Sequence, residues 1–90
     1  MKLKFFATYR AITRCSETTL PAEEDILSLL RTVSRIYPGL SDKILNAEGT
    51  DLGSDVIVLV NGRNIVHLNG VRTKITDDDT VAIFPLVAGG

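Results

Sequence analysis

The chain has 90 residues, of which 44% are hydrophobic and 23% are charged, and its formal net charge is −1. A chain of this length forms one domain and buries roughly 60% of the surface that its unfolded form exposes. We therefore expect a single globular domain over residues 1–90. The near-neutral charge argues against nucleic acid as a partner, because binding to a phosphate backbone relies on a basic face.

The only cysteine is Cys15. A single thiol excludes an internal disulfide, a four-cysteine iron–sulfur cluster and a cysteine-rich zinc site, and we expect no bound metal or cofactor. The first residues alternate in polarity and contain no long apolar run, so we expect neither a signal peptide nor a membrane span. These features together predict a cytoplasmic protein.

The N-terminal segment has the pattern of a β-hairpin. Residues 2–10 alternate between polar and apolar, which predicts a half-buried strand. Its apolar face would carry Leu3, Phe5, Ala7 and Tyr9. Residues 16–20 are rich in β-branched side chains and are close enough to pair back on the first strand.

Apolar residues then recur at spacings of three and four, which predicts an amphipathic helix. Its apolar stripe would contain Ile26, Leu29, Leu30, Val33 and either Ile36 or Tyr37. Asp25 is placed to cap the start of this helix, and Pro38 with Gly39 ends it. Residues 40–46 are expected to form a short second helix, followed by a loop over residues 47–55.

The second half of the chain is expected to be mostly strands. The apolar run of residues 56–60 predicts a central strand buried on both faces, and Asn61-Gly62 predicts a tight turn. A short strand through Ile65 and Val66, an acidic turn at residues 77–79 and a final strand at residues 81–84 follow. This order predicts an α+β domain of the β-grasp (ubiquitin-like) type, with a mixed sheet of about five strands and one main helix packed across one face.

The chain ends in Gly89-Gly90 after an uncharged run that starts at residue 80. Glycine has no Cβ, so two in succession pass through a gap that admits only a backbone. The alternative is an ordinary chain end, where glycine is common. A strand that leads the tail away from a packed core favours a functional role for the backbone carboxylate of Gly90.

Residues 58–63, 76–79 and 81–90, together with the opening Phe5-Phe6-Ala7, resemble the MoaD/ThiS family of ubiquitin-like sulfur carriers. The most specific part is the Phe-Pro-x-Val-Ala-Gly-Gly ending directly after a strand. The extra segment of residues 40–55 looks more like MoaD, the small subunit of molybdopterin synthase, than like the shorter thiamine-pathway carriers.

Two positions depart from the family pattern. Asp78 stands where the family's turn usually has glycine, and a side chain there suggests a left-handed backbone conformation. Leu86 stands where a second proline is common, which makes the root of the tail less rigid. Neither change affects the diglycine.

The resemblance implies a sulfur carrier in molybdenum cofactor (molybdopterin) biosynthesis, and not an enzyme. A ubiquitin-activating-like (MoeB-like) adenylyltransferase would use ATP to adenylate the Gly90 carboxylate, and a sulfur donor would displace AMP to leave a thiocarboxylate. A MoaE-like large synthase subunit would then use this sulfur. Gly90 would be the reacting residue, and Gly89, Ala88 and Val87 would form the tail that gives it access.

Three alternatives to this function stay open. A ubiquitin-like protein modifier would join the same Gly90 to lysines of other proteins, and a related carrier would deliver sulfur to a thiamine or tRNA precursor. In the third alternative the domain is a plain interaction module whose diglycine is idle.

Strand parity predicts where partners dock. Phe6 falls on the face of the first strand that points away from the helix, and Ala82 and Phe84 fall on the same face of the last strand. These two strands are neighbours in a β-grasp sheet, so Phe6 and Phe84 should form an exposed patch, with Ile65 as a third member. Such a patch on a small protein usually marks an interface, although single exposed apolar residues are common.

Overall fold

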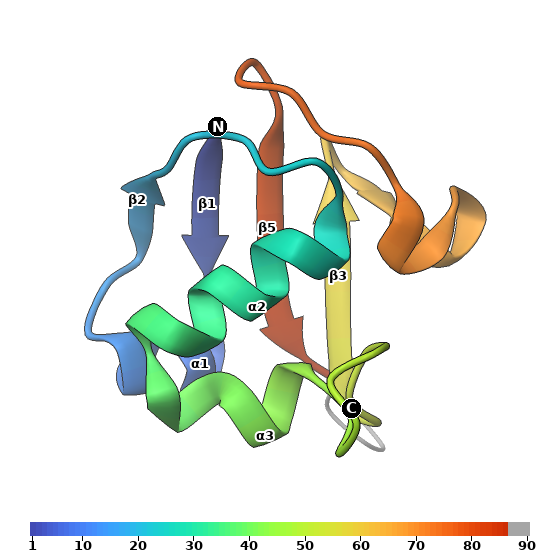
Figure 1. Ribbon diagram of the computed structural model, residues 1–90. Helices are drawn as coiled ribbons and strands as arrows, with labels where there is room; N and C mark the ends of the chain where they lie inside the picture. Colours follow the sequence, from blue (N-terminus) through green and yellow to red (C-terminus); the bar gives the residue numbers. More distant parts are fainter. Residues whose placement is uncertain (87–90) are drawn as a thin grey trace.

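The computed structural model describes residues 1–86, which form a five-stranded mixed sheet with helices against one face (Figure 1). The strands are β1 (Lys2–Phe5), β2 (Glu17–Thr19), β3 (Val56–Val60), β4 (Arg63–Asn64) and β5 (Thr80–Pro85). They lie in the order β2-β1-β5-β3-β4. β1 and β5 run parallel, and the other neighbouring pairs are antiparallel. The predicted β-grasp fold is confirmed.

The helices are α1 (Ala7–Thr13), α2 (Ile26–Ile36) and α3 (Ser41–Ile44), and 3₁₀ turns occur at Pro38–Leu40, Ile65–His67 and Gly70–Arg72. Helix α2 crosses one face of the sheet (Figure 1). As predicted, Asp25 caps its start, because one carboxylate oxygen accepts a hydrogen bond of 2.9 Å from the Ser28 amide. No helix within residues 1–86 is long and apolar enough to cross a bilayer.

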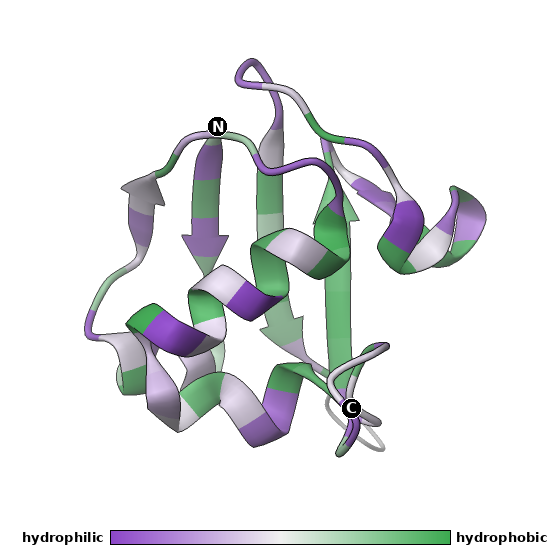
Figure 2. Cartoon of the chain, viewed as in Figure 1, coloured by the Kyte–Doolittle hydropathy of each residue, from purple (hydrophilic) through white to green (hydrophobic). Residues whose placement is uncertain are grey.

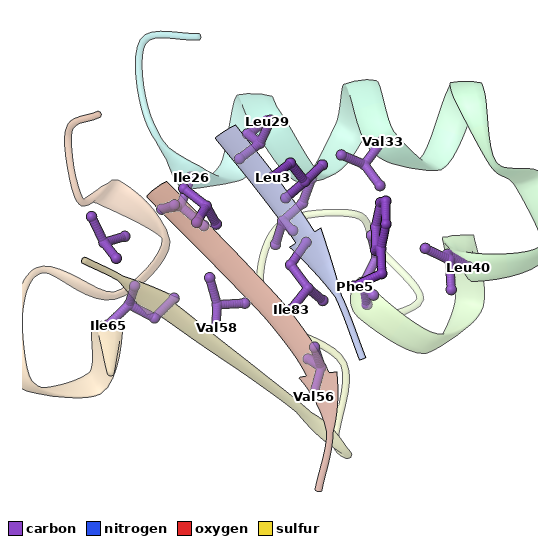
Figure 3. Packing of buried hydrophobic residues seen from close by; sticks show 14 of the residues in the cluster. Leu3, Phe5, Ile26, Leu29, Val33, Leu40, Val56, Val58, Ile65 and Ile83 are labelled. Carbon is purple, nitrogen blue, oxygen red and sulfur yellow. The ribbon is translucent and has the colours of Figure 1, made fainter. Parts of the chain in front are cut away.

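The core lies between α2 and the face of the sheet that α2 covers, which we call the inner face (Figure 3). The apolar stripe of α2 is fully buried and consists of Ile26, Leu29, Leu30 and Val33. It packs against equally buried side chains of the sheet, which are Leu3, Phe5, Val58, Val81 and Ile83. Figure 2 shows the hydrophobic residues that run along β3 and β5 beneath the helix. The predicted amphipathic stripe therefore supplies one side of the core.

The predicted strand over residues 2–10 is wrong beyond Phe5, because the chain turns into α1 at Ala7. Tyr9 and Thr13 are the buried residues of α1. Phe5, Tyr9 and Thr13 are four residues apart, and this spacing returns a side chain to the same face in a helix as well as in a strand. The alternating pattern therefore did not distinguish the two structures.

Strand β3 is not buried on both faces as predicted. Val56, Val58 and Val60 are buried, whereas Ile57 and Leu59 are only half-buried. No helix of the described chain covers the opposite face of the sheet, which we call the outer face (Figure 1). A continuous apolar run therefore marks a strand whose outer side chains are partly open to solvent.

The strand predicted through Ile65 and Val66 is also wrong. Strand β4 consists of Arg63–Asn64 alone, and a 3₁₀ turn begins at Ile65. The side-chain oxygen of Asn64 accepts a hydrogen bond of 3.0 Å from the Val66 amide and so caps this turn. A local side-chain acceptor thus ends the strand early.

The acidic turn differs from the expected geometry at Asp78. The non-glycine residues with positive φ in the described chain are Ala7, Arg14 and Asn61, so Asp78 is not left-handed. The carboxylate of Asp79 closes the turn instead, by accepting a hydrogen bond of 2.8 Å from the Thr76 amide. This hydrogen bond stabilises the turn without a glycine at position 78.

Candidate functional site

An apolar surface lies on the outer face beside the end of β5. It surrounds a hollow of about 360 Å³, and we call the six residues that line this hollow the outer patch: Phe6, Ala7, Leu59, Ala82, Phe84 and Pro85. The rings of Phe6 and Phe84 meet edge to face, with centroids 6.0 Å apart and an angle of 87° between the ring planes. Phe6 is 42% exposed. Two aromatic side chains in contact at the surface make this hollow the candidate functional site.

The pairing of the strands explains why these residues meet. Ala82 of β5 lies opposite Leu59 of β3 and opposite Lys4 of β1. Side chains that lie opposite each other in paired strands share a face. Phe84, two residues beyond Ala82, therefore points outward too, and the contact with Phe6 that strand parity predicted is present.

Phe6 is held at the junction between β1 and α1. Its amide donates to the carbonyl of Ile83 at 3.3 Å, and its own carbonyl accepts from the amides of Tyr9 and Arg10 at 3.1 and 3.3 Å. The next residue, Ala7, has a φ of 53°. This left-handed conformation costs a residue with a Cβ roughly 1–2 kcal/mol. The strand passes directly into the helix, and the Phe6 ring remains on the outer face.

Ile65 does not belong to the outer patch, and its predicted place there is wrong. Its side chain is 0% exposed and lies in the core (Figure 3). The neighbouring Val66 is the exposed one, at 65%. The 3₁₀ turn rotates the chain away from strand alternation, so the parity argument fails at this position.

The sequence did not identify Leu59, Ala7 and Pro85 as members of the outer patch. For Leu59 the signal was present, because Val58 and Leu59 must point to opposite faces of a strand. For Ala7 it was absent, because the expected strand placed Ala7 on the inner face. The turn into α1 reverses that placement.

Leu86, the residue that follows β5, is hydrogen-bonded to the loop before β3. The carbonyl of Asp55 accepts a hydrogen bond of 2.7 Å from the Leu86 amide and one of 3.4 Å from the Tyr9 hydroxyl. Burial of the phenol, and secondarily the nearby Asp55 carboxylate, raise the pKa of Tyr9 above its ordinary value. These contacts hold the end of β5 beside the outer patch.

A second, more polar groove of about 450 Å³ also lies beside the end of β5. Pro85 lines both this groove and the hollow of the outer patch. The groove contains charges of both signs, from Asp42, Lys43 and Asp55. The end of β5 therefore borders both an apolar and a polar surface.

The predicted reacting residue Gly90, and the tail residues Gly89, Ala88 and Val87, lie outside the described residues. What the structure does describe is the surface around the point where this tail begins.

Comparison with known proteins identifies the family. The model of the ThiS family matches residues 3–90. Small archaeal modifier protein 3 of Haloferax volcanii is 36% identical over 92 aligned positions, which cover 100% of this chain and 98% of that protein. The molybdopterin synthase sulfur carrier subunit of Emericella nidulans is 30% identical over 89 positions, which cover 99% of this chain and 96% of that protein.

A solved structure agrees with this assignment. The solution structure of small archaeal modifier protein 1 from Methanosarcina acetivorans has a TM-score of 0.85 and 32% sequence identity, and the match covers 99% of this chain and 94% of that chain. These relatives are small carriers and modifiers, and not catalysts. The chain therefore belongs to the ThiS family, as a small sulfur carrier or ubiquitin-like modifier with the β-grasp fold.

Proposed function

We propose that the chain is a sulfur carrier that acts as the small subunit of a molybdopterin synthase, with Gly90 as its reacting residue. The observation that carries this proposal is the position of the outer patch. Phe84 lies two residues before Leu86, whose amide is bound to Asp55. A partner that covers the patch therefore lies next to the start of the tail.

The proposed reaction begins with activation of the Gly90 carboxylate. A carboxylate is a poor acyl donor, because its leaving group would be oxide. A carboxylate oxygen attacks the α-phosphorus of ATP, which forms the acyl adenylate and releases pyrophosphate. A hydrosulfide equivalent then attacks the carbonyl carbon, so that a C–S bond forms, the C–O bond to AMP breaks and AMP leaves. The product is a terminal thiocarboxylate.

Two proteins would bind the outer patch in turn. The first is a MoeB-like adenylyltransferase that activates Gly90 with ATP, and the second is a MoaE-like synthase subunit, inside which a pterin precursor receives the sulfur. Aromatic residues often contribute most of the binding energy at such interfaces, and Phe6 and Phe84 have the exposure and the position for this role. Gly89, Ala88 and Val87 would lead the reacting group into each active site.

A second candidate function is protein modification, which is favoured by the similarity to small archaeal modifier protein 3. In this case a lysine amine attacks the activated carbonyl carbon of Gly90, and an isopeptide bond replaces the bond to the leaving group. The docking surface and the activation step stay the same. The two functions differ in the group that attacks the activated Gly90, which is a sulfur nucleophile in one and a protein amine in the other. A third possibility is a sulfur carrier that delivers its sulfur to a thiamine or tRNA precursor.

The test is the intact mass of the chain purified from its own host, together with the proteins that co-purify. The sulfur-carrier function predicts that sulfur replaces one oxygen at Gly90 and that a large synthase subunit is bound. The modifier function predicts lysines in other proteins that carry residues 75–90 after trypsin cleaves this chain at Lys74.

A strain in which Gly89 and Gly90 are deleted provides the control. The deletion lies beyond every contact described above, so the domain is expected to fold normally while molybdenum cofactor synthesis is lost. Normal cofactor synthesis in this strain would contradict the sulfur-carrier function.

A further inference from the structure

The polar groove beside the end of β5 has no part in the function proposed above. Its volume is about 450 Å³, and its lining residues come from α1, α3, the loop before β3 and the end of β5. The charged residues among them are Asp42, Lys43 and Asp55, and all three are exposed. Three more lining residues carry hydroxyl groups, which are Thr8, Tyr9 and Ser54. The groove is therefore suited to polar and ionic contacts.

The charges of this groove are not paired within the described chain. The ion pairs among residues 1–86 join other groups, namely the amine of Met1 with Asp77, Lys2 with Glu17, and Lys74 with Glu24. The Asp55 carboxylate does act inside the groove, because it contributes to the raised pKa of Tyr9. Two carboxylates stand against one ammonium group, so the groove has an excess of negative charge.

The position of the groove means that an enzyme acting on Gly90 has to cover it. Pro85 lines the groove, and the carbonyl of Asp55 accepts the 2.7 Å hydrogen bond from the Leu86 amide. Residues 87–90 follow directly, and four extended residues span at most about 14 Å. An active site that encloses Gly90 therefore lies within this distance of Leu86, and the rim of that site lies over the groove.

We propose that the groove receives a basic side chain, an arginine or a lysine, of the adenylyltransferase that activates Gly90. This inference rests on the proposed function. A carboxylate that is covered without a counter-charge loses its hydration at a cost in free energy, and a basic group placed between Asp42 and Asp55 offsets that cost. A partner with an acidic or wholly apolar rim leaves both carboxylates unpaired, so the groove also selects among partners.

The chain offers variants that change the charge of the groove and leave its shape intact. Asp42→Asn and Asp55→Asn each remove one negative charge, and Asp55→Asn keeps the backbone carbonyl that binds Leu86. Lys43→Gln removes the one positive charge among the lining residues. Glu48→Gln is the matched control, because Glu48 is exposed in the same loop as Asp55 but does not line the groove.

The experiment measures ATP–pyrophosphate exchange by the host's own ubiquitin-activating-like adenylyltransferase, with the full-length chain as the varied substrate. Asp42→Asn and Asp55→Asn are each expected to raise KM for the carrier about threefold with kcat unchanged, and the double variant about tenfold. These differences should shrink as salt is added, because ions screen exposed charges. Lys43→Gln is expected to lower KM, and Glu48→Gln to leave both constants unchanged. Urea denaturation checks that every variant is folded.

The results separate this inference from the function on which it rests. Normal exchange with an unchanged KM for the Asp42 and Asp55 variants would overturn the role of the groove alone. An equal rise for Glu48→Gln would overturn it too, because the effect would then come from the overall charge. A rise for Lys43→Gln would show that the enzyme presents an acidic group instead of a basic one. Absence of exchange with the original chain would overturn the proposed function and this inference together.

Discussion

Both faces of the sheet carry apolar side chains, but only the inner face is covered by a helix of the described chain. On the inner face, Leu3, Val58 and Ile83 are completely buried beneath α2. On the outer face, Phe84 remains half-buried and Phe6 is 42% exposed. Hydrophobic surface thus serves folding on one face, and we propose that it serves docking on the other.

β5 contributes to both faces through adjacent residues. Ile83 points into the core, and Phe84 points into the outer patch. They differ by one position in the chain, because successive side chains of a strand point to opposite faces. Substitutions at these two positions therefore separate stability from docking within a single strand.

The largest effect is expected from Ile83→Ala on the inner face. Removal of a fully buried isoleucine side chain is expected to lower the free energy of unfolding by about 2–5 kcal/mol, through lost apolar burial and the cavity left behind. Urea denaturation measures this change. A loss no greater than that of an exposed substitution would show that the inner face is not the main source of stability.

Phe84→Ala should weaken partner binding more than it lowers stability. We expect a loss of about 1 kcal/mol in unfolding free energy, because the ring is half-buried and has one aromatic contact. Binding to the activating enzyme should weaken about 30-fold, which is the loss of about 2 kcal/mol typical of an interface hot spot. Calorimetric titration measures the affinity, and unaltered binding would remove the outer patch from the docking surface.

Asp25→Ala tests the helix that covers the inner face. The Ser28 amide would lose its acceptor, and loss of an N-terminal cap lowers the unfolding free energy by about 1 kcal/mol. Affinity for the partner is expected to stay unchanged, because α2 lies on the opposite side of the sheet from the patch. Asp78→Ala is the matched control, since Asp78 is exposed and its side chain makes no hydrogen bond within residues 1–86.

A smaller effect is expected from pH. The Ser28 amide lowers the pKa of Asp25, and the Asn61 side chain, followed by the Thr76 amide, lowers the pKa of Asp79, each from an ordinary value of 3.8. A carboxyl group whose pKa is lower in the folded protein stabilises it above the unfolded-state pKa. This contribution is lost progressively as the pH falls through 3.8 and below.

Urea denaturation at a series of pH values between about 7 and 3 measures this loss. The double variant Asp25→Asn with Asp79→Asn is the control, and its unfolding free energy should fall less steeply in acid. The same slope in the variant and in the original chain would show that other carboxyl groups account for the acid sensitivity.

The elements predicted correctly have strong local signals. For α2 there are three independent ones: the apolar stripe, the cap at Asp25 and the Pro38-Gly39 stop. The turn at Asn61-Gly62 also has a strong local signal, because asparagine and glycine tolerate positive φ. Asn61 has a φ of 52° and Gly62 a φ of 82°. Local sequence is sufficient where backbone preference and apolar periodicity agree.

The errors occurred where one local pattern fits two structures. Residues 7–10 fit a strand and a helix equally well, and the choice depends on contacts that are distant in sequence, such as that of the Tyr9 hydroxyl with the Asp55 carbonyl. After Asn64, a single hydrogen bond that the Val66 amide donates to the Asn64 side-chain oxygen caps a 3₁₀ turn where a strand was predicted. Periodicity contains no information about either contact.

The sequence by itself determined the β-grasp order, the capped amphipathic helix and the expectation of a reactive C-terminal glycine, because these depend on periodicity, turn residues and a recognisable ending. Only the tertiary structure decided the full set of side chains that make up the outer patch. Leu59 and Ala7 join Phe6 and Phe84 there because strand pairing and the turn at Ala7 bring together residues from three separate segments. A surface of this kind is defined by neighbours in space, which the order of residues along the chain does not reveal.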